Sequence, residues 1–599
     1  MRKIYPVISV LFAMFLYDGA LAGTWYVDGS VPQSGDGKTW ETAFDTIQKG
    51  IDAAGDEDTV IVAQGTYTEN IQFKGKNILL TGTNPFDLTV IGNTIIDGNQ
   101  AGSVVAFSGT EGATCILRGF TIRNGKAQYW GGGICGVPWP WTNNTHATIR
   151  NNVVTGNSSD HGGGLSNCDG TIVNNLVLSN SATKSGGGIR NCNGDIGNNS
   201  IAGNTAGWSG GGLAWCNGSI RGNSIMSNSA DSEGGGLYQC NGTVENNRIK
   251  RNSAWRGGGM YWCDATIRNN TITENSVAAG GGGLEACDGT IEGNIISGNT
   301  ADSAAGLNGC NGIVQNNTIT LNAAEWRGGG VGYCDGMVRN NTISGNSAEE
   351  GAGLYGCDAT IVSNLVAGNS AAFWGGGVMW CGGAVLNNTI VGNSAGLSGG
   401  GLNNCAGTIA NCIIWGNAAG DGPQLYNSSE PSYSCIQGWA GGGQENTDED
   451  PRFVDADGPD NDPQTYEDND YHLTSDSPCV DEGSNAALGP PGLDLDGNLR
   501  IARWKYPIVA IVDMGAYEYN SRPFAISQFG FTNWPPPGGR YLVWNSQPND
   551  TYTVWSSYSL AGEWHELGSV ASQGETTSYT VTGLLPWNWH ALFYRVEME

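Results

Sequence analysis

The sequence predicts an all-β protein whose main body is a parallel β-helix, a solenoid with three short strands in each turn of 23–24 residues. The first observation is a repeat between Gly131 and Ala419, in which a cysteine recurs every 23 or 24 residues. The second is that its apolar runs are only three or four residues long and are separated by Gly and Asn turn signals. The third is the high glycine content, 96 of 599 residues, without the Gly-x-y period of collagen. Such runs leave no room for a helix, so each unit closes into a turn that stacks about 4.8 Å from the next.

The repeat unit has the consensus G-G-G-L-x-x-C-[DN]-G-T-I-x-N-N-x-I-x-G-N-S-A. Its cysteines are Cys168, Cys192, Cys216, Cys240, Cys263, Cys287, Cys310, Cys334, Cys357, Cys381 and Cys405. The asparagine twelve positions after each cysteine, from Asn180 to Asn417, never varies. We expect these asparagines at corners, in a left-handed backbone and with their amides bonded to the next turn. A leucine-rich repeat is disfavoured because it needs an L-x-x-L-x-L frame, which is missing.

The cysteine column is expected to be buried and reduced, because a free cysteine packs as a small apolar residue. Stacked Cβ atoms about 4.8 Å apart are farther from each other than a disulfide requires. Disulfides between adjacent turns remain the alternative in an exported protein. Zinc is disfavoured, since the chain has no C-x-x-C pair and only 5 histidines.

The beginning of the chain predicts export. Residues 1–22 have the form of a signal peptide, with Arg2 and Lys3, the apolar stretch 7–16, and Ala22 before the cleavage point at Gly23. No later stretch reaches about 18 uninterrupted apolar residues, so we expect no transmembrane segment in the mature chain. The net charge of −29 makes nucleic acid an improbable partner. We therefore expect an extracellular or cell-surface protein.

Composition divides the mature chain into four parts. Residues 23–130 are predicted to form an N-terminal cap and the irregular first coils, with a helix over 42–54 that covers the open end through Phe44, Ile47 and Ile51. Residues 131–440 hold the regular β-helix repeats, with a nine-residue insertion at 138–146. An acidic region follows at 441–520, and residues 521–599 are predicted to be a small β-sandwich-like module.

The acidic region contains two clusters of oxygen ligands around glycine turns, at 455–462 and 494–498, and the first supplies the candidate metal ligands. Asp455, Asp457, Asp460 and Asp462 crowd oxygen ligands around a glycine turn, an arrangement that calcium prefers. Their spacing is not that of an EF-hand, and a solvated acidic linker with Asx turns explains it as well. No cofactor is required by the sequence, and calcium is the candidate.

Several segments resemble a known group of proteins. The G-G-G-[LI] and G-N-S-A units are similar to right-handed β-helix repeat proteins of the pectate-lyase-like superfamily and to polymorphic outer membrane proteins. W-Y-V-D at 25–28, T-A-F-D-T-I-Q at 42–48 and G-T-Y-T-E-N-I at 65–71 resemble the start of bacterial members. S-P-C-V-D-E-G-S-N at 477–485, L-D-L-D-G-N-L-R at 493–500 and V-D-M-G-A-Y-E-Y at 512–519 resemble a choice-of-anchor Q region. The resemblance implies a right-handed coil and a bacterial surface setting, but no particular activity.

No catalytic site stands out. The N-T-D, D-D, G-H-G and R-I-K motifs of polygalacturonases that share this fold do not occur as a set. His161 precedes an ordinary glycine run and is interpreted as a loop surface residue. Arg221, Glu245, Arg268 and Glu292 follow their cysteines by five positions in consecutive turns, which predicts a surface charge ladder.

Aromatic residues form two columns beside the glycine-rich strand. Trp208, Trp255 and Trp326 lie eight positions before a cysteine, with Trp374 one position later, and Trp215, Trp262, Tyr333 and Trp380 lie immediately before one. Other turns place polar residues or glycine there, so we expect both columns to face outward. Arg256 and Arg327 follow their tryptophans and are candidates for pairing with acidic sugars.

Two functions remain open. In the first, the aromatic columns bind an extracellular polysaccharide or a surface partner without catalysis, as in an adhesin. In the second, the protein is a polysaccharide lyase or glycoside hydrolase. The missing catalytic motifs favour the first, while packing of the tryptophans against one another is the structural alternative to ligand binding.

Overall fold

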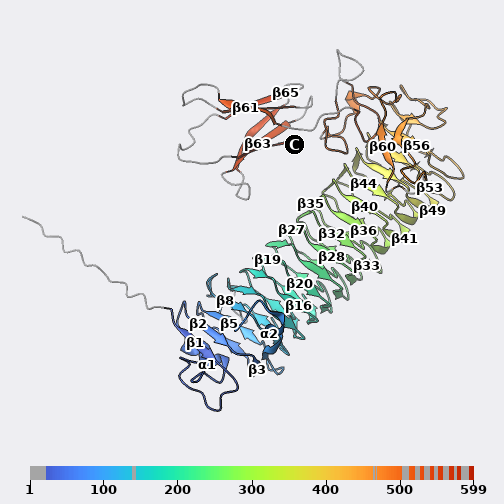
Figure 1. The fold of residues 1–599 in the computed structure, drawn as a ribbon. Helices are drawn as coiled ribbons and strands as arrows, with labels where there is room; N and C mark the ends of the chain where they lie inside the picture. Colours follow the sequence, from blue (N-terminus) through green and yellow to red (C-terminus); the bar gives the residue numbers. More distant parts are fainter. Residues whose placement is uncertain are drawn as a thin grey trace, which may run out of the picture.

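The computed structural model describes residues 22–137, 143–462, 466, 468–490, 492–501 and 511–519, and six strands between 526 and 598. The signal peptide prediction over 1–22 lies outside these residues except for Ala22, and the insertion predicted at 138–146 is described only from 143. The described chain is dominated by a solenoid of about sixteen stacked turns, seen in Figure 1 as a rod that runs from blue to orange. In the part that the structure describes, no helix is both long and apolar enough to cross a membrane.

One turn shows how the repeat folds. It runs through β14 (Leu165–Ser166), β15 (Ile172–Val173), β16 (Leu176–Leu178) and β17 (Ser181–Ser185), and the next turn begins at β18 (Ile189–Arg190). Each strand pairs in parallel with its equivalent one turn later. The predicted parallel β-helix is therefore confirmed.

Three long sheets run along the described solenoid, with 16, 15 and 16 strands. We name them sheet A (which contains β15), sheet C (β14) and sheet B (β16). A fourth sheet of 11 strands, sheet D, extends from β13 (Ser158–His161) to β53 (Ser394–Ala395). The three strands predicted per turn are present, and the G-N-S-A segment adds the fourth. The alanine of this segment is buried, and Ala182, for example, is 5% exposed.

The interior is a stack of identical side chains. Leu213, Cys216, Ile220 and Ile225 of one turn are all fully buried, and the equivalent positions of the other turns join the same core. Each strand directs one residue of a pair inward and its neighbour outward. The aliphatic and cysteine columns of the repeat are thus the core, and the columns between them are the surface.

Two ladders of buried asparagines tie the turns together. One is the invariant column that contains Asn228 and Asn252, and the other contains Asn223 and Asn247. Their amides bond the next turn, as predicted. The predicted left-handed backbone is wrong for the invariant column, however, because the positive φ falls on the preceding residue, for example Ser227 at 53°. The asparagine itself turns inward, where its amide replaces backbone hydrogen bonds at the corner.

The cysteine column is buried and reduced, as predicted. All 16 cysteines are free and buried. The Sγ of Cys192 accepts a hydrogen bond from the backbone N–H of Cys168 at 3.3 Å and donates to the carbonyl of Arg190 at 3.3 Å. The thiols therefore act as corner hydrogen-bonding groups as well as core residues.

A helix covers the N-terminal end, but it is shorter than predicted. It is α1 (Ile47–Ala53), which buries Ile47 and Ile51 against β1 (Thr24–Val27). Phe44 lies before the helix, where its backbone pairs with Tyr26 and its ring stacks on Trp25. A second short helix, α2 (Leu88–Asn93), was not predicted.

The acidic region folds back onto the last turns of the solenoid. Its antiparallel pair is β59 (Phe453–Asp455) with β60 (Asp470–Leu473). The hydroxyl of Tyr466 donates to the carbonyl of Gly392 at 2.9 Å, and the N–H of Ala516 donates to Thr389 Oγ1 at 2.9 Å. The region is therefore packed against the outer side of sheet B, and it is not the solvated linker that was one alternative.

The C-terminal module has six described strands. β61 (Ile526–Phe531), β62 (Arg540–Asn545) and β65 (Thr576–Val581) form one antiparallel sheet. β64 (His565–Ala571), β63 (Thr551–Ser557) and β66 (Phe593–Met598) form the other. Trp544 of the first sheet and Tyr552 of the second are buried in one apolar cluster, with their ring centres 5.6 Å apart.

Candidate functional site

The outer side of sheet C carries the predicted aromatic columns. Each sheet C strand has two residues, of which the first points into the core and the second outward, as Leu237 and Tyr238 do in β26 (Leu237–Tyr238). The residue that follows precedes the cysteine and has a left-handed backbone in every one of the turns from Asn167 to Asn404. This corner aims its side chain away from the core.

The column before the cysteine places large rings in this left-handed conformation. The φ angles of Trp215, Trp262, Tyr333 and Trp380 are 53°, 53°, 55° and 54°. Trp262, Tyr333 and Trp380 are exposed, and Trp215 is half-buried. A bulky residue at positive φ is strained, and five of the other turns use Asn or Gly, which tolerate this conformation, while two use Gln239 and Ala286. The rings are therefore retained against a local conformational preference.

The second column lies at the end of sheet D. Trp208, Trp255 and Trp326 are 58%, 57% and 59% exposed. Trp374 is less exposed and stacks at a tilt on Phe373, with ring centres 5.5 Å apart. Trp374 pairs in register with Glu350, which pairs with Arg327, so it is aligned with Arg327 and not with Trp326. We call the two columns together, all eight rings, the aromatic face.

Three tyrosines beneath the aromatic face were not predicted. Tyr238, Tyr261 and Tyr355 are the outward residues of their sheet C strands, yet they are at most 9% exposed. Tyr238 stacks on Tyr261 with centres 6.0 Å apart, and Trp215 meets the edge of Tyr238 at 5.1 Å. The second residue of the sheet C strands differs from turn to turn, with Arg190 and Gly332 among its occupants. This variability is the sequence signal that would have identified the position as outward-facing.

Both predicted arginines of the face are engaged inside the protein. Arg327 Nε donates to Glu350 at 2.8 Å, and an Arg256 guanidinium nitrogen lies 2.5 Å from Glu285. Glu285 is 2% exposed, and its Oε1 also accepts from Asn308 at 3.1 Å, while its Oε2 has no hydrogen-bond partner. Burial raises the pKa of Glu285 to about 7. These pairs leave neither arginine free of a protein carboxylate.

His161, the last residue of β13 in sheet D, differs from the prediction. Its ring stacks on Trp130 with centres 4.8 Å apart, and its Nδ1 is buried without a partner. Burial, with Arg190 and Lys184 nearby, lowers the pKa of His161 to about 4. His161 is therefore a half-buried neutral ring and not a freely solvated loop residue.

The predicted charge ladder lies on sheet A. Arg221, Glu245, Arg268 and Glu292 are in register in consecutive turns. Arg268 Nε donates to Glu245 at 2.8 Å, whereas Arg221 pairs with Asp195 of the preceding turn at 2.6 Å. The ladder is a surface feature, as predicted.

The predicted calcium ligands lie at and after the end of β59. Among the described residues the structure has no group of three or more His, Cys, Asp or Glu side chains placed to hold a metal ion. Asp455 shares a hydrogen bond with Asp457, and partial desolvation together with this contact raises the pKa of Asp455. Calcium binding by Asp455, Asp457, Asp460 and Asp462 stays a prediction.

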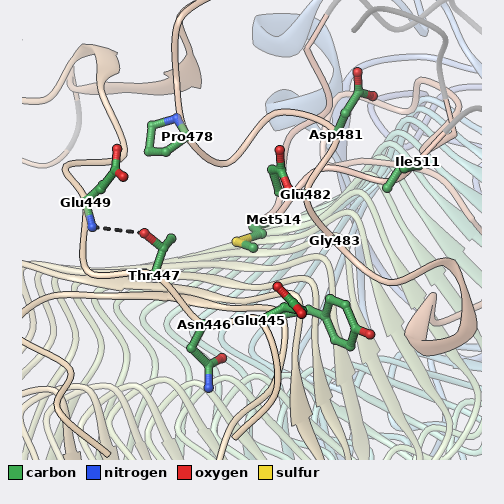
Figure 2. Close-up of a pocket in the computed structure, with 11 residues that line it drawn as sticks. Glu445, Asn446, Thr447, Glu449, Pro478, Asp481, Glu482, Gly483, Ile511 and Met514 are labelled. Atoms are coloured by element: carbon green, nitrogen blue, oxygen red, sulfur yellow. Dashed lines mark hydrogen bonds between the residues drawn. The ribbon is translucent and has the colours of Figure 1, made fainter. Parts of the chain in front are cut away.

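A cavity of about 570 Å³ lies where the acidic region meets the last turns (Figure 2). Its walls include Glu445, Glu449, Asp481 and Glu482, which project from different loops around Met514. The lining is acidic, but acidic side chains alone do not define a ligand.

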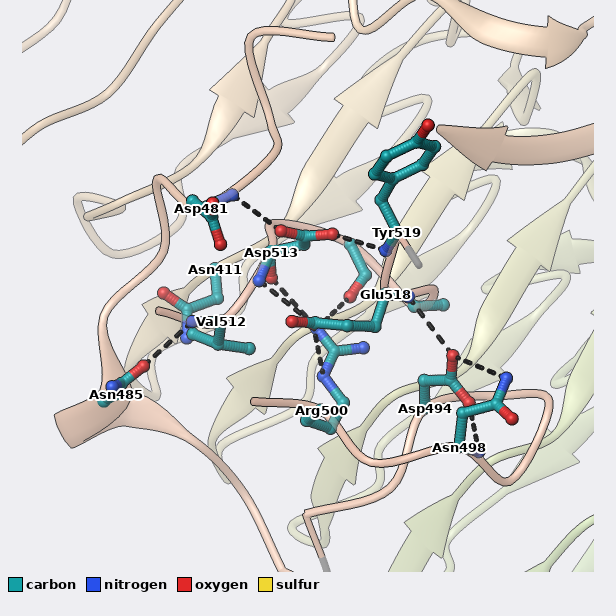
Figure 3. A network of polar contacts seen from close by, with 12 residues as sticks. Asn411, Asp481, Asn485, Asp494, Asn498, Arg500, Val512, Asp513, Glu518 and Tyr519 are labelled. Carbon is teal, nitrogen blue, oxygen red and sulfur yellow. Dashed lines mark hydrogen bonds and ion pairs between the residues drawn. The ribbon is translucent and has the colours of Figure 1, made fainter. Parts of the chain in front are cut away.

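A buried polar network beside this cavity joins loops of the acidic region (Figure 3). Arg500 is fully buried, and one of its guanidinium nitrogens donates to the carbonyls of Asp513 at 3.0 Å and Gly515 at 2.7 Å. The Asp513 carboxylate accepts from the N–H groups of Asp481 and Tyr519, both at 2.6 Å. Burial raises the pKa of Asp513 to about 7. These motif residues hold the region's loops together.

Comparisons with known proteins agree with this architecture. The family model described as "Right handed beta helix region" matches residues 260–432. The central solenoid is a right-handed β-helix. A protein of Arabidopsis thaliana named "Probable pectinesterase/pectinesterase inhibitor 17" is 36% identical over 89 residues, which is 14% of this chain and 16% of that protein.

A solved structure entitled "Crystal structure of pectate lyase Pel9A" is also similar to this chain. The identity is 13%, the alignment covers 84% of this chain and 98% of that one, and the TM-score is 0.19. At this TM-score the likeness carries no argument about structure or activity.

Proposed function

We propose that this protein is a non-catalytic, exported binding protein whose aromatic face holds an extended polysaccharide. The observation that carries the proposal is the combination of exposure and backbone strain. Trp262 and Trp380 are 45% and 54% exposed although each occupies a left-handed corner that Asn, Gly or the smaller side chains of Gln239 and Ala286 fill in other turns. Exposed rings maintained at a conformational cost are expected at sites that bind something.

The spacing of the rings fits a repeating ligand. Trp215 and Trp262 are two turns apart, since Leu213 pairs with Leu237 and Leu237 with Met260. Two turns correspond to about 9.6 Å, close to a disaccharide step in an extended chain. The solenoid is rigid, so the rings lose little freedom when a polymer binds.

The proposed setting is the outside of a bacterial cell. It is supported by the signal-like residues 1–22 and by the similarity of residues 477–519 to choice-of-anchor Q regions. The negative charge of −29 disfavours nucleic acid and suits a soluble surface protein. The partner is then an extracellular polysaccharide or another surface molecule.

Cleavage of a polysaccharide is the second candidate. It is favoured by Glu285, a carboxyl group beneath the aromatic face whose pKa of about 7 would suit a general acid or base. The name of the similar Arabidopsis protein, a probable pectinesterase, also points to a polysaccharide as the substrate. Against it, Glu285 is 2% exposed, so a substrate reaches it only if Arg256 moves.

A glycan array followed by analysis of products tests the two candidates together. The binding proposal predicts retention of at least one polysaccharide with no new reducing ends or unsaturated sugars. Accumulation of either product with the wild-type protein, and its loss in Glu285→Gln, would replace the proposal with the enzymatic one. Retention of no polysaccharide at all would reject both.

A further inference from the structure

Arg190 occupies a special place at the N-terminal end of the aromatic face. It is the outward residue of β18, and its guanidinium carbon lies 4.5 Å from the ring centre of Trp130 and 4.6 Å from that of Trp215. Two indoles therefore hold one guanidinium. This arrangement fixes the side chain and shields it from water.

Arg190 also lacks the counter-charge that the neighbouring arginines have. In the part of the chain that the structure describes, Arg190 makes no ion pair, and its Nε is buried without a hydrogen-bond partner. The arginines paired with a carboxylate of the protein include Arg221, Arg251, Arg256, Arg268 and Arg327. Arg150 likewise has a buried, unpartnered Nε, so what distinguishes Arg190 is its position between two indoles on the aromatic face.

Two further polar groups beside Arg190 are unsatisfied. Ser166 pairs with Arg190 in register, is fully buried, and has an Oγ without a partner. The Nδ1 of His161, whose ring stacks on Trp130, is likewise buried and unpartnered. Buried polar atoms are rarely left unpaired, so these two, together with the Nε of Arg190, indicate a missing partner.

We propose that the guanidinium of Arg190, which lies beside the buried Ser166 and His161, binds an oxyanion carried by the polymer on the aromatic face. The chemistry is that of a carboxylate or sulfate ester on a sugar, which matches the donors of a guanidinium. Three turns separate Arg190 from Trp262, about 14 Å, so one chain reaches both. This inference rests on the proposed function and specifies the ligand as an anionic polysaccharide.

The test is affinity electrophoresis of the full mature protein in gels that contain polygalacturonate, dextran sulfate or unsubstituted dextran. We expect one of the two anionic polymers to retard the wild type more than dextran does, despite the like charge of the protein. Arg190→Gln is expected to weaken that binding about tenfold, with partial retention in Arg190→Lys. Arg221→Gln is the control, because Arg221 lies on sheet A, outside the aromatic face, and pairs with Asp195.

The outcomes separate the inference from the proposed function. If only polygalacturonate retards the protein, the bound group is a carboxylate. If only dextran sulfate retards the protein, the bound group is a sulfate ester. If Arg190→Gln binds the anionic polymers like the wild type, or only lowers the melting temperature, Arg190 is structural and the inference is wrong. If only dextran binds, and the double variant of Trp215 and Trp262 abolishes that binding, the proposed function stands without the anion site. Binding to none of the three polymers overturns the inference.

Discussion

The side-chain oxygen of Asn252 accepts two hydrogen bonds from Asn228, one from its backbone N–H and one from its Nδ2, each 3.0 Å long. The Nδ2 of Asn252 in turn donates to Asn275 and to the carbonyl of Ile225, both at 3.0 Å. Every polar atom of the buried amide is satisfied by the turns on either side. The same contact recurs along the solenoid, so it is a main source of register between turns.

Asn252→Ala is therefore expected to destabilise the solenoid strongly. It leaves the donors of Asn228 and the carbonyl of Ile225 unpaired in the core, and we expect a loss of about 3 kcal/mol. Asn241→Ala is the matched control, since the exposed Asn241 oxygen accepts only the N–H of Asp264, at 2.9 Å. The control should cost about 0.5–1 kcal/mol. Guanidinium denaturation monitored by circular dichroism checks both, and equal losses would show that the ladder is not special.

The buried thiols are expected to be inert in the native protein. All 16 thiols are buried, which shields them from reagents. At Cys115 and Cys412 burial also raises the pKa, to about 12 and about 11, so these two carry almost no thiolate at neutral pH. A thiol reagent should find no reactive group until the protein is denatured, and then all 16. Peptide mapping of unreduced protein that recovers disulfides between adjacent turns would contradict this.

His472 should make the acidic region sensitive to alkali. Its Nε2 lies 2.7 Å from Asp496 and its Nδ1 2.5 Å from Asp470, and these carboxylates raise the pKa of His472 to about 9 from 6.5. Because the folded pKa is raised, the stabilisation is complete below about pH 6.5 and is lost as the pH rises through about 9.

Limited proteolysis of the wild type and His472→Gln measures this effect. The variant should be cut faster within residues 441–519 at pH 6, and the two proteins should converge at pH 10. His146→Gln alters an exposed histidine elsewhere and should behave as the wild type at both pH values. A difference between the wild type and His472→Gln that persists at pH 10 would contradict the ion-pair explanation.

The repeat made the solenoid predictable because each column of the sequence has one environment. The positions of Cys216 and Ile220 recur in every turn, so their burial follows from the period alone. The left-handed backbone was predicted at the invariant asparagine and lies one residue before it. Asparagine at a corner suits both a left-handed backbone and an inward-pointing amide, so the sequence alone does not distinguish the two. The fourth strand was missed because Ser and Ala carry no strong strand preference.

The surface was less predictable because its contacts join different turns and different regions. Arg256 and Glu285 are 29 residues apart in the sequence, so their pairing forms only when the solenoid winds back on itself. Tyr466 docks on Gly392 across 74 residues, and no local pattern announces that contact. Trp130, Arg190 and Trp215 come from three different turns. Their contact therefore cannot be predicted before the register between the turns is known.

The central claim is that the aromatic face binds a polysaccharide. The most direct test measures how tightly the polysaccharide identified on the glycan array binds to two double variants. The first combines Trp215→Ala with Trp262→Ala, and the second combines Trp326→Ala with Trp374→Ala. Stacking on each ring contributes about 0.5–1.5 kcal/mol, so each pair should weaken binding about tenfold or more without lowering the melting temperature. Trp40→Ala, which removes an exposed ring of the N-terminal cap, is the control and should bind normally. If both double variants bind like the wild type but melt earlier, the tryptophans are structural and the account is wrong.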